Sequence, residues 1–112
     1  MSKQGWIGVD LDGTLAHYGS FQGMDHIGEP IPLMVERVKE WLANGIEVRI
    51  MTARVSQGTN THSVQDIIVL IQNWCEKHIG VALPVTCRKD YQMVELWDDR
   101  AVRVIKNTGE IG

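Results

Sequence analysis

The chain has 112 residues, a length that suits one domain rather than two. Its hydrophobic fraction of 44% and charged fraction of 22% are ordinary for a globular protein. The formal net charge of −3 argues against the broad basic surface that grips nucleic acid along its length. It leaves open a small anionic ligand or a single phosphorylated end, because such a ligand needs only a few local donors.

The sequence also bears on the expected location of the protein. Its first residues lack the apolar stretch of a secretory signal, and the strongly apolar run Ile67–Ile71 is far shorter than the ~20 residues that span a bilayer. The two cysteines, Cys75 and Cys87, do not have the spacing of a metal site and are too few for a disulfide scaffold. We therefore expect reduced thiols, no membrane partner and a cytoplasmic location.

The first half of the chain alternates between strand and helix signals. The apolar run Trp6–Val9 predicts a buried strand, and the glycine-rich segment 13–30 that follows predicts a long loop of the functional kind. Apolar residues at helical spacing after Pro32 predict a helix that ends at Asn44-Gly45. Alternation over residues 46–51 predicts a second strand.

The second half continues the same alternation. Residues 63–78 share an apolar helical face, and Ser63 is a suitable N-cap for that helix. Short apolar segments at 85–87 and 93–97 predict a third and a fourth strand, and residues 101–105 predict a fifth strand or a helix. This order is typical of an α/β protein with a mostly parallel sheet of about five strands, which binds ligands at the carboxyl ends of its strands.

Polar residues follow each predicted strand, at the edge where such ligands bind. They are Asp10 and Asp12, then Thr52 and Arg54, then Lys89, and finally Asp98 and Asp99. Four carboxylates brought together repel one another, and a divalent cation removes that cost. Mg²⁺ prefers hard oxygen ligands and is commonly shared with a phosphate, so the pattern favours a magnesium and phosphoryl site.

The same residues, in the same order, resemble the haloacid dehalogenase (HAD) superfamily of phosphohydrolases. Residues 10–15, Asp-Leu-Asp-Gly-Thr-Leu, resemble its first motif D-x-D-G-T-L. Thr52, Lys89 and the pair Asp98-Asp99 are similar to its second, third and fourth motifs. The resemblance implies one HAD-like phosphatase domain over residues 1–112, with a Rossmann-like core and helices beside its sheet.

The resemblance implies a Mg²⁺-dependent phosphomonoester hydrolase. Asp10 would be the nucleophile that forms an aspartyl-phosphate, and Asp12 would be the general acid and base. A carboxylate at Asp12 resembles the phosphatase branch rather than the true dehalogenases. Mg²⁺ would be held by the Asp10 side chain, the Asp12 backbone carbonyl and Asp98, with Asp99 in support.

The phosphoryl oxygens would be held by Thr52 and Lys89, and Gly13 would permit a tight turn whose N–H groups face them. Lys89 lies only nine residues before Asp98, a short interval for the family, so the neighbouring Arg88 is an alternative ligand. The Thr-Ala-Arg sequence that ends at Arg54 resembles the branch containing the 3′-phosphatase domain of phage polynucleotide kinase. Arg54 is therefore a further candidate phosphate ligand, the alternative being a surface arginine that pairs with a nearby carboxylate.

No residues are left over for a cap domain, since residues 15–30 suffice only for a short flap and 55–84 for one loop and one helix. The resemblance thus implies a capless enzyme with an open site. The substrates considered are a phosphorylated small molecule, a nucleotide and a nucleic-acid 3′-phosphate end. A homo-oligomer, in which a partner subunit covers the site, also remains open.

Two other functional classes fit parts of the pattern. A catalytically weak HAD domain could bind a phosphorylated partner, although binding alone does not require Asp12. A receiver-like phospho-accepting module has a similar length and α/β order. A receiver, however, carries its acceptor aspartate after the middle strand, where this chain has Thr52 or the pair Arg88-Lys89.

Overall fold

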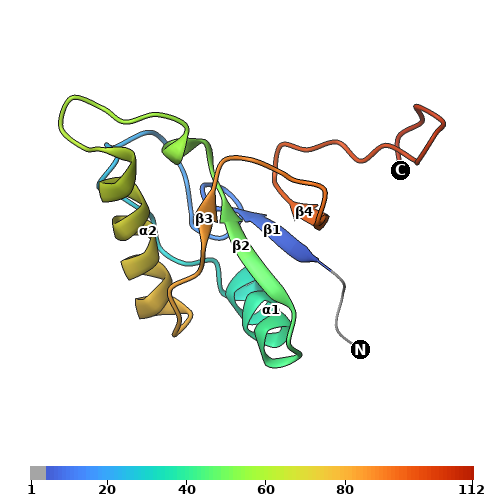
Figure 1. Cartoon of the computed structure of the whole chain (residues 1–112), viewed down its shortest axis with the longest axis horizontal. Helices are drawn as coiled ribbons and strands as arrows, with labels where there is room; N and C mark the ends of the chain where they lie inside the picture. The colour runs from blue at the N-terminus through green and yellow to red at the C-terminus, as the bar shows by residue number, and fades with distance from the viewer. Residues whose placement is uncertain (1–4) are drawn as a thin grey trace.

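The computed structural model describes residues 5–112 and contains a parallel sheet with two α-helices (Figure 1). The elements are β1 (Trp6–Asp10), α1 (Pro32–Ala43), β2 (Glu47–Met51), a single 3₁₀ turn η1 (Ala53–Val55), α2 (Val64–His78), β3 (Val85–Thr86) and β4 (Met93–Trp97). All strand pairs are parallel, in the order β3-β2-β1-β4. The α/β class is confirmed and is compatible with a Rossmann-like fold, but within residues 5–112 the sheet has four strands, not about five.

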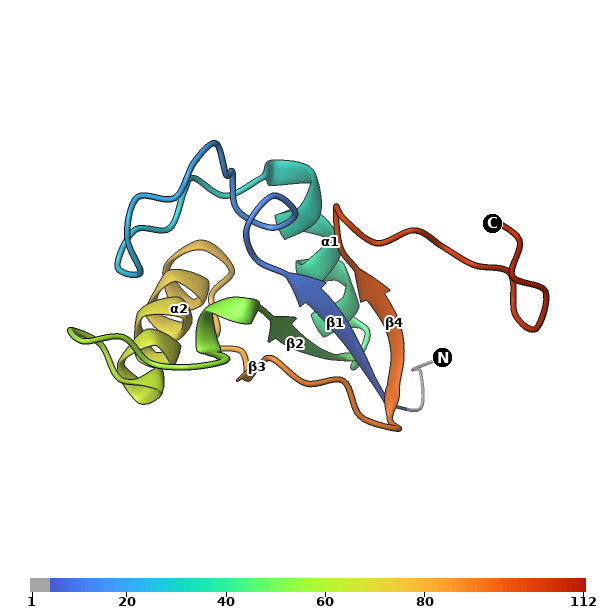
Figure 2. The same cartoon turned by 90° about the horizontal axis from the view of Figure 1, so that it is seen from above.

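Both helices cover the same face of the sheet (Figure 2). Because side chains alternate along a strand, Ile7 and Val9 of β1 point to the same side as Val48 and Ile50 of β2. These four side chains form one core with the apolar faces of α1 and α2, and each is at most 1% exposed. Two right-handed crossovers in one direction along a sheet place their helices on one side, which accounts for this arrangement.

The ends of the helices follow from local sequence. Ser63 caps α2 as expected: its side chain accepts from the Asp66 N–H at 3.1 Å, and the Asp66 carboxylate accepts from the Ser63 N–H at 3.0 Å. Pro32 begins α1, where a missing N–H costs nothing, and Asn44 ends it. Neither helix of the described chain is long and apolar enough to cross a bilayer.

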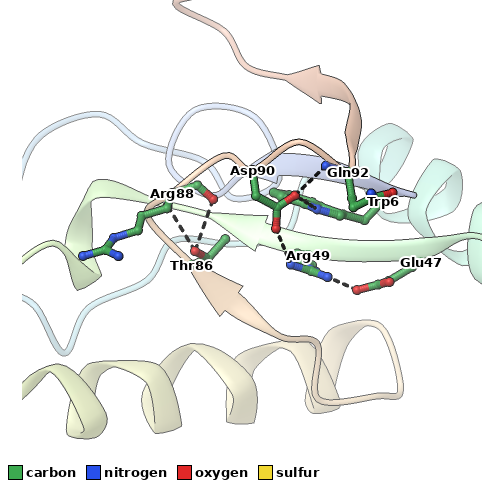
Figure 3. A network of polar contacts seen from close by, with 7 residues as sticks. All are labelled: Trp6, Glu47, Arg49, Thr86, Arg88, Asp90 and Gln92. Carbon is green, nitrogen blue, oxygen red and sulfur yellow. Dashed lines mark hydrogen bonds and ion pairs between the residues drawn. The ribbon is translucent and has the colours of Figure 1, made fainter. Parts of the chain in front are cut away.

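A loop, rather than a third helix, carries the chain from β3 to β4 along the opposite face of the sheet. Residues 87–92 make this crossover, in which Asp90 accepts a hydrogen bond from the Trp6 indole N–H at 2.8 Å (Figure 3). The Arg49 guanidinium stacks on the Trp6 ring at 4.5 Å and lies 3.5 Å from Asp90. Trp6 is fully buried beneath Arg49 and Asp90, so the loop helps to cover the face of the sheet that neither α1 nor α2 covers.

The C-terminal residues do not form the fifth strand or helix expected at 101–105. Every residue from Asp99 to Gly112 is exposed, and the chain extends away from the sheet (Figures 1 and 2). Within this segment Val104 and Ile111 make an isolated antiparallel bridge. The sequence predicted a strand or a helix here, but among the described residues no strand of the sheet pairs with this segment.

Candidate active site

A pocket of about 560 Å³ opens at the carboxyl ends of β1, β2 and β4. Parallel strands end at one edge of a sheet, so the residues that follow them in sequence meet there. The pocket is lined by six of the side chains singled out from the sequence: Asp10, Asp12, Thr52, Arg54, Asp98 and Asp99. Arg100 also lines it, and its backbone N–H donates to the Asp98 carboxylate at 2.8 Å.

Three carboxylates form a cluster in this pocket. Each of Asp10, Asp98 and Asp99 offers an oxygen atom, and the three atoms lie within 4.8 Å of one another. The pKa of Asp10 is raised from 3.8 to about 7. Burial is the largest cause, and the neighbouring carboxylates of Asp98, Asp99 and Asp12 also contribute. The folded chain therefore holds a carboxyl group that ionises only near neutral pH, and added positive charge would favour its ionised form.

Thr14 ties the two ends of this cluster together. Its hydroxyl oxygen lies 3.4 Å from Asp10 Oδ2 and 3.2 Å from Asp99 Oδ1, and it accepts a hydrogen bond from the Asp99 N–H at 3.0 Å. The turn after β1 is thereby attached to the end of β4. Sequence reasoning assigned Thr14 no role of its own, although its place in the D-x-D-G-T motif was a signal that it contributes to the site.

Asp12 is paired with Arg54 across the pocket. The guanidinium donates from Nε to Asp12 Oδ2 and from Nη2 to Asp12 Oδ1, both at 2.8 Å, and a third hydrogen bond joins Nη1 to the Met24 carbonyl at 3.1 Å. Arg54 is only 9% exposed. A bidentate contact of this kind fixes both side chains in orientation. The sequence left open a carboxylate partner for Arg54 but did not identify Asp12, 42 positions away, as that partner.

Thr52 and Gly13 lie where the sequence placed them, at the ends of β2 and β1. Thr52 is 4% exposed, and its hydroxyl accepts from the Arg54 N–H at 3.1 Å, which shapes the turn that carries Arg54 into the pocket. Gly13 has φ +89°, and a Cβ there would lie 2.7 Å from an oxygen of Asp99. Only glycine combines this backbone conformation with so close an approach to the carboxylate cluster.

Lys89 and Arg88 are not brought into the pocket. Both are exposed, and neither belongs to its lining. Beyond β3 the chain turns onto the opposite face of the sheet, where the neighbouring Asp90 bonds to Trp6, and this path carries Lys89 away from the carboxylates. Cys87 is the residue of that segment that reaches the pocket. The expectation that Lys89 or Arg88 lies beside the carboxylates is therefore not met in the structure.

Apolar and aromatic side chains also line the pocket. Tyr18, Phe21 and Met24, from the segment after β1, line the pocket together with Met51 and Cys87. Tyr18 is 41% exposed and Phe21 61% exposed, so both rings are accessible from solvent. The sequence placed Tyr18 and Phe21 in a flap, either in contact with substrate or as solvated loop residues. The pocket thus offers both charged side chains and apolar or aromatic side chains to a ligand.

The donor set suits a hard divalent cation. Oxygen ligands of the carboxylate type are those that Mg²⁺ prefers, and it commonly takes one or two of them while keeping water or phosphate as its other ligands. The raised pKa of Asp10 supports this fit, because the cluster carries negative charge that no cation of the pocket contacts directly: Arg54 pairs with Asp12 instead. Asp10, Asp98 and Asp99 are the side chains that would hold the ion.

Comparison with known proteins gives the fold but no function. No family model matches the chain, and no curated protein matches it. A solved structure, described as the conserved protein coded by a locus from Bacteroides thetaiotaomicron, is similar with a TM-score of 0.59 and 21% identity. The match covers 89% of this chain and 79% of that one. At this identity the similarity supports a shared fold alone.

Proposed function

We propose that the protein is a Mg²⁺-dependent phosphomonoester hydrolase of HAD type that acts through an aspartyl-phosphate. The observation that carries the proposal is the cluster of Asp10, Asp98 and Asp99, whose oxygen atoms lie within 4.8 Å at the edge of a parallel sheet. The Arg54-paired Asp12 lies in the same pocket. Phosphoryl transfer by an aspartate requires a nucleophilic carboxylate at a cation site and a second, separately oriented carboxylate.

In the first step, the Asp10 carboxylate attacks the phosphorus atom. A bond forms between its oxygen and phosphorus while the bond from phosphorus to the ester oxygen breaks, and Asp12 in its protonated form gives its proton to the departing oxygen. Asp10 must be ionised for this attack, yet its pKa is about 7 in the protein alone. Bound Mg²⁺ would supply the positive charge that favours the ionised form and would neutralise the phosphoryl oxygens.

In the second step, water attacks the phosphorus atom of the aspartyl-phosphate. Asp12, now a carboxylate, takes a proton from that water, and the bond between phosphorus and the Asp10 oxygen breaks. Inorganic phosphate and the free Asp10 carboxylate result. The chain thus returns to its starting state, with the proton again on Asp12.

Arg54 connects substrate binding to the state of Asp12. A guanidinium carries five N–H donors, and three of those in Arg54 are used by Asp12 and the Met24 carbonyl. Two remain for a phosphoryl oxygen. A dianionic phosphate would therefore compete with Asp12 for the guanidinium.

A catalytically weak domain that binds a phosphorylated partner is the second candidate, and one observation favours it. The pocket lacks the lysine that the family resemblance implied, because Lys89 lies outside its lining. Thr52 and Arg54 then remain as phosphate ligands. A slow enzyme and a binding domain differ in whether phosphate is released, so turnover separates them.

Two aromatic side chains of the pocket support a proposal about the substrate class. The exposed rings of Tyr18 and Phe21 can stack on a planar group attached to the phosphate. Among the candidates, a nucleotide or the 3′-phosphate end of a nucleic acid offers such a group, whereas a small sugar phosphate does not. We therefore propose nucleotides or 3′-phosphorylated ends as the better substrates.

Phosphate release tests the proposal directly. The full chain is assayed with nucleotides, 3′-phosphorylated oligonucleotides and sugar phosphates, with Mg²⁺ or with a chelator. Activity should require Mg²⁺ and disappear in Asp10→Asn. The matched control is Glu76→Gln, which neutralises an exposed carboxylate on α2, away from the pocket.

The outcomes separate the functional classes. Turnover that persists in a clean Asp10→Asn preparation refutes the nucleophile. Binding of phosphorylated ligands without turnover supports the weak binding domain. Stable labelling by a small phosphodonor, without release of phosphate, supports the receiver-like module.

A further inference from the structure

The C-terminal arm, defined here as residues 101–112, leaves apolar side chains without cover. Val102 is 68% exposed, Val104 56% and Ile111 78%. The arm has local order: the Ile105 N–H donates to the Glu110 carbonyl at 2.7 Å, and Val104 pairs with Ile111. It is thus a small hairpin with exposed apolar side chains, and both views show it extending away from the sheet (Figures 1 and 2).

The edge strand β4 lies next to the start of the arm and is also uncovered. It pairs with β1 on one side, and no strand of the described residues pairs with its other side. Val94 is 44% exposed and Leu96 37% exposed on this strand. The outer edge of a sheet with exposed apolar side chains is a template for pairing with another chain.

The arm is held away from its own β4. Only residues 98–100 separate the two, and their direction is fixed by bonds from the Asp99 N–H to the Thr14 hydroxyl and from the Arg100 N–H to the Asp98 carboxylate. To fold back along its own strand, the chain would have to reverse within these residues and break those bonds. The arm of another copy meets no such restriction.

The chain exposes more surface than a compact monomer of its mass. The chain exposes 7396 Å², about 1,200 Å² more than the ~6,200 Å² expected for a monomer of 12.6 kDa. Its radius of gyration of 14.4 Å likewise exceeds the ~13 Å expected for this length. If two copies each buried that excess, the interface would reach the ~1,200–2,000 Å² or more of a stable dimer.

Charge also favours a second copy as the occupant. The arm, residues 101–112, carries Arg103 and Lys106 against a single acid, Glu110, a net charge of +1. The chain as a whole has a net charge of −3, so the remaining residues carry −4. The basic arm of one copy is therefore attracted to the acidic body of another.

We propose that two copies of the chain exchange C-terminal arms, so that the arm of each lies along β4 of the other. A two-fold axis makes both contacts identical, and every apolar side chain left exposed on the arm and on β4 gains a partner. The interface lies at the end of β4 that carries Asp98 and Asp99 into the pocket. It does not depend on the proposed enzymatic activity.

Sedimentation velocity of the full chain, over a wide range of micromolar concentrations, tests the proposal. The expected species has twice the mass of the 12.6 kDa chain. Ile111→Lys on the arm and Leu96→Lys on β4 should each raise the dissociation constant about tenfold or more. The control Val69→Lys changes a side chain of similar exposure, 43%, on α2 and should leave it unchanged.

A mixed-label NMR sample shows which surfaces touch. With methyl groups labelled in one copy and not in the other, contacts between copies should join Val104 and Ile111 to Val94 and Leu96. Three results overturn the proposal: a monomer at all concentrations, a dimer that both lysine variants leave intact, or arm contacts only within one copy. A monomer whose arm signals shift only when an oligonucleotide is added also overturns it and assigns the arm to nucleic acid instead.

Discussion

The charge of Asp10 should make the stability of the metal-free protein depend on pH. Its pKa rises from 3.8 to about 7 on folding, because the group is partly buried beside three other carboxylates. Between these two values the folded chain binds more protons than the unfolded chain. The contribution of this group to the free energy of unfolding is therefore greatest below pH 3.8 and is lost as the pH rises through about 7.

The magnitude follows from the size of the shift. At about 1.36 kcal/mol per pH unit, the shift corresponds to about 4 kcal/mol over the full range. The site is partly open to solvent, and screening reduces this figure, so we expect about 1–1.5 kcal/mol between pH 5 and pH 8. Mg²⁺ favours the ionised carboxylate and should flatten the dependence or reverse it.

Urea unfolding, followed by tryptophan fluorescence in the presence of a chelator, measures this effect. The comparison is between the wild type and Asp10→Asn, which cannot ionise, at each pH. The free energy of unfolding of the wild type, relative to that of Asp10→Asn, should fall by the stated amount between pH 5 and pH 8. Saturating Mg²⁺ should act on the wild type and remove this fall. Parallel pH profiles for the two proteins, or a wild-type profile that ignores Mg²⁺, would refute the reasoning.

Three further outcomes are expected. Arg54→Lys replaces the bidentate contact to Asp12 with a single point charge, so kcat/KM for a phosphomonoester should fall about 10–100-fold; an unchanged value would remove Arg54 from the site. Phe21→Ala should lower kcat/KM about tenfold for a nucleotide but not for a sugar phosphate, since base stacking on an aromatic ring contributes about 1–3 kcal/mol. Ser63→Ala removes the N-cap of α2 and should lower the free energy of unfolding by about 1 kcal/mol in urea titrations, with no effect on phosphate release.

The elements that the sequence predicted correctly have strong local signals. Strand β1, strand β2 and helix α2 each follow from periodicity over several residues together with a stop signal or a cap such as Ser63. The segment 101–105 failed because alternation indicates only that a strand would be amphipathic. Whether it forms depends on a neighbouring strand to pair with, and pairing is a property of the whole fold.

The candidate site divides in the same way. Asp10, Asp98 and Asp99 could be placed together because each follows a strand, and parallel strands end at one edge. Lys89 also follows a strand, but the short loop to β4 crosses the opposite face and takes it away. A carboxylate partner for Arg54 was one of the alternatives, but its identity as Asp12 depends on the relative position of two turns.

Local sequence and tertiary structure determined different features of this 112-residue chain. The sequence by itself determined the α/β class, the helix boundaries and the acidic residues at the strand ends, because these follow from local periodicity and from strand polarity. Tertiary structure decided the number of strands, the path of residues 87–92, the partner of Arg54 and the exposure of the C-terminal arm. Each of these depends on contacts between residues distant in the chain, whose geometry no local pattern encodes.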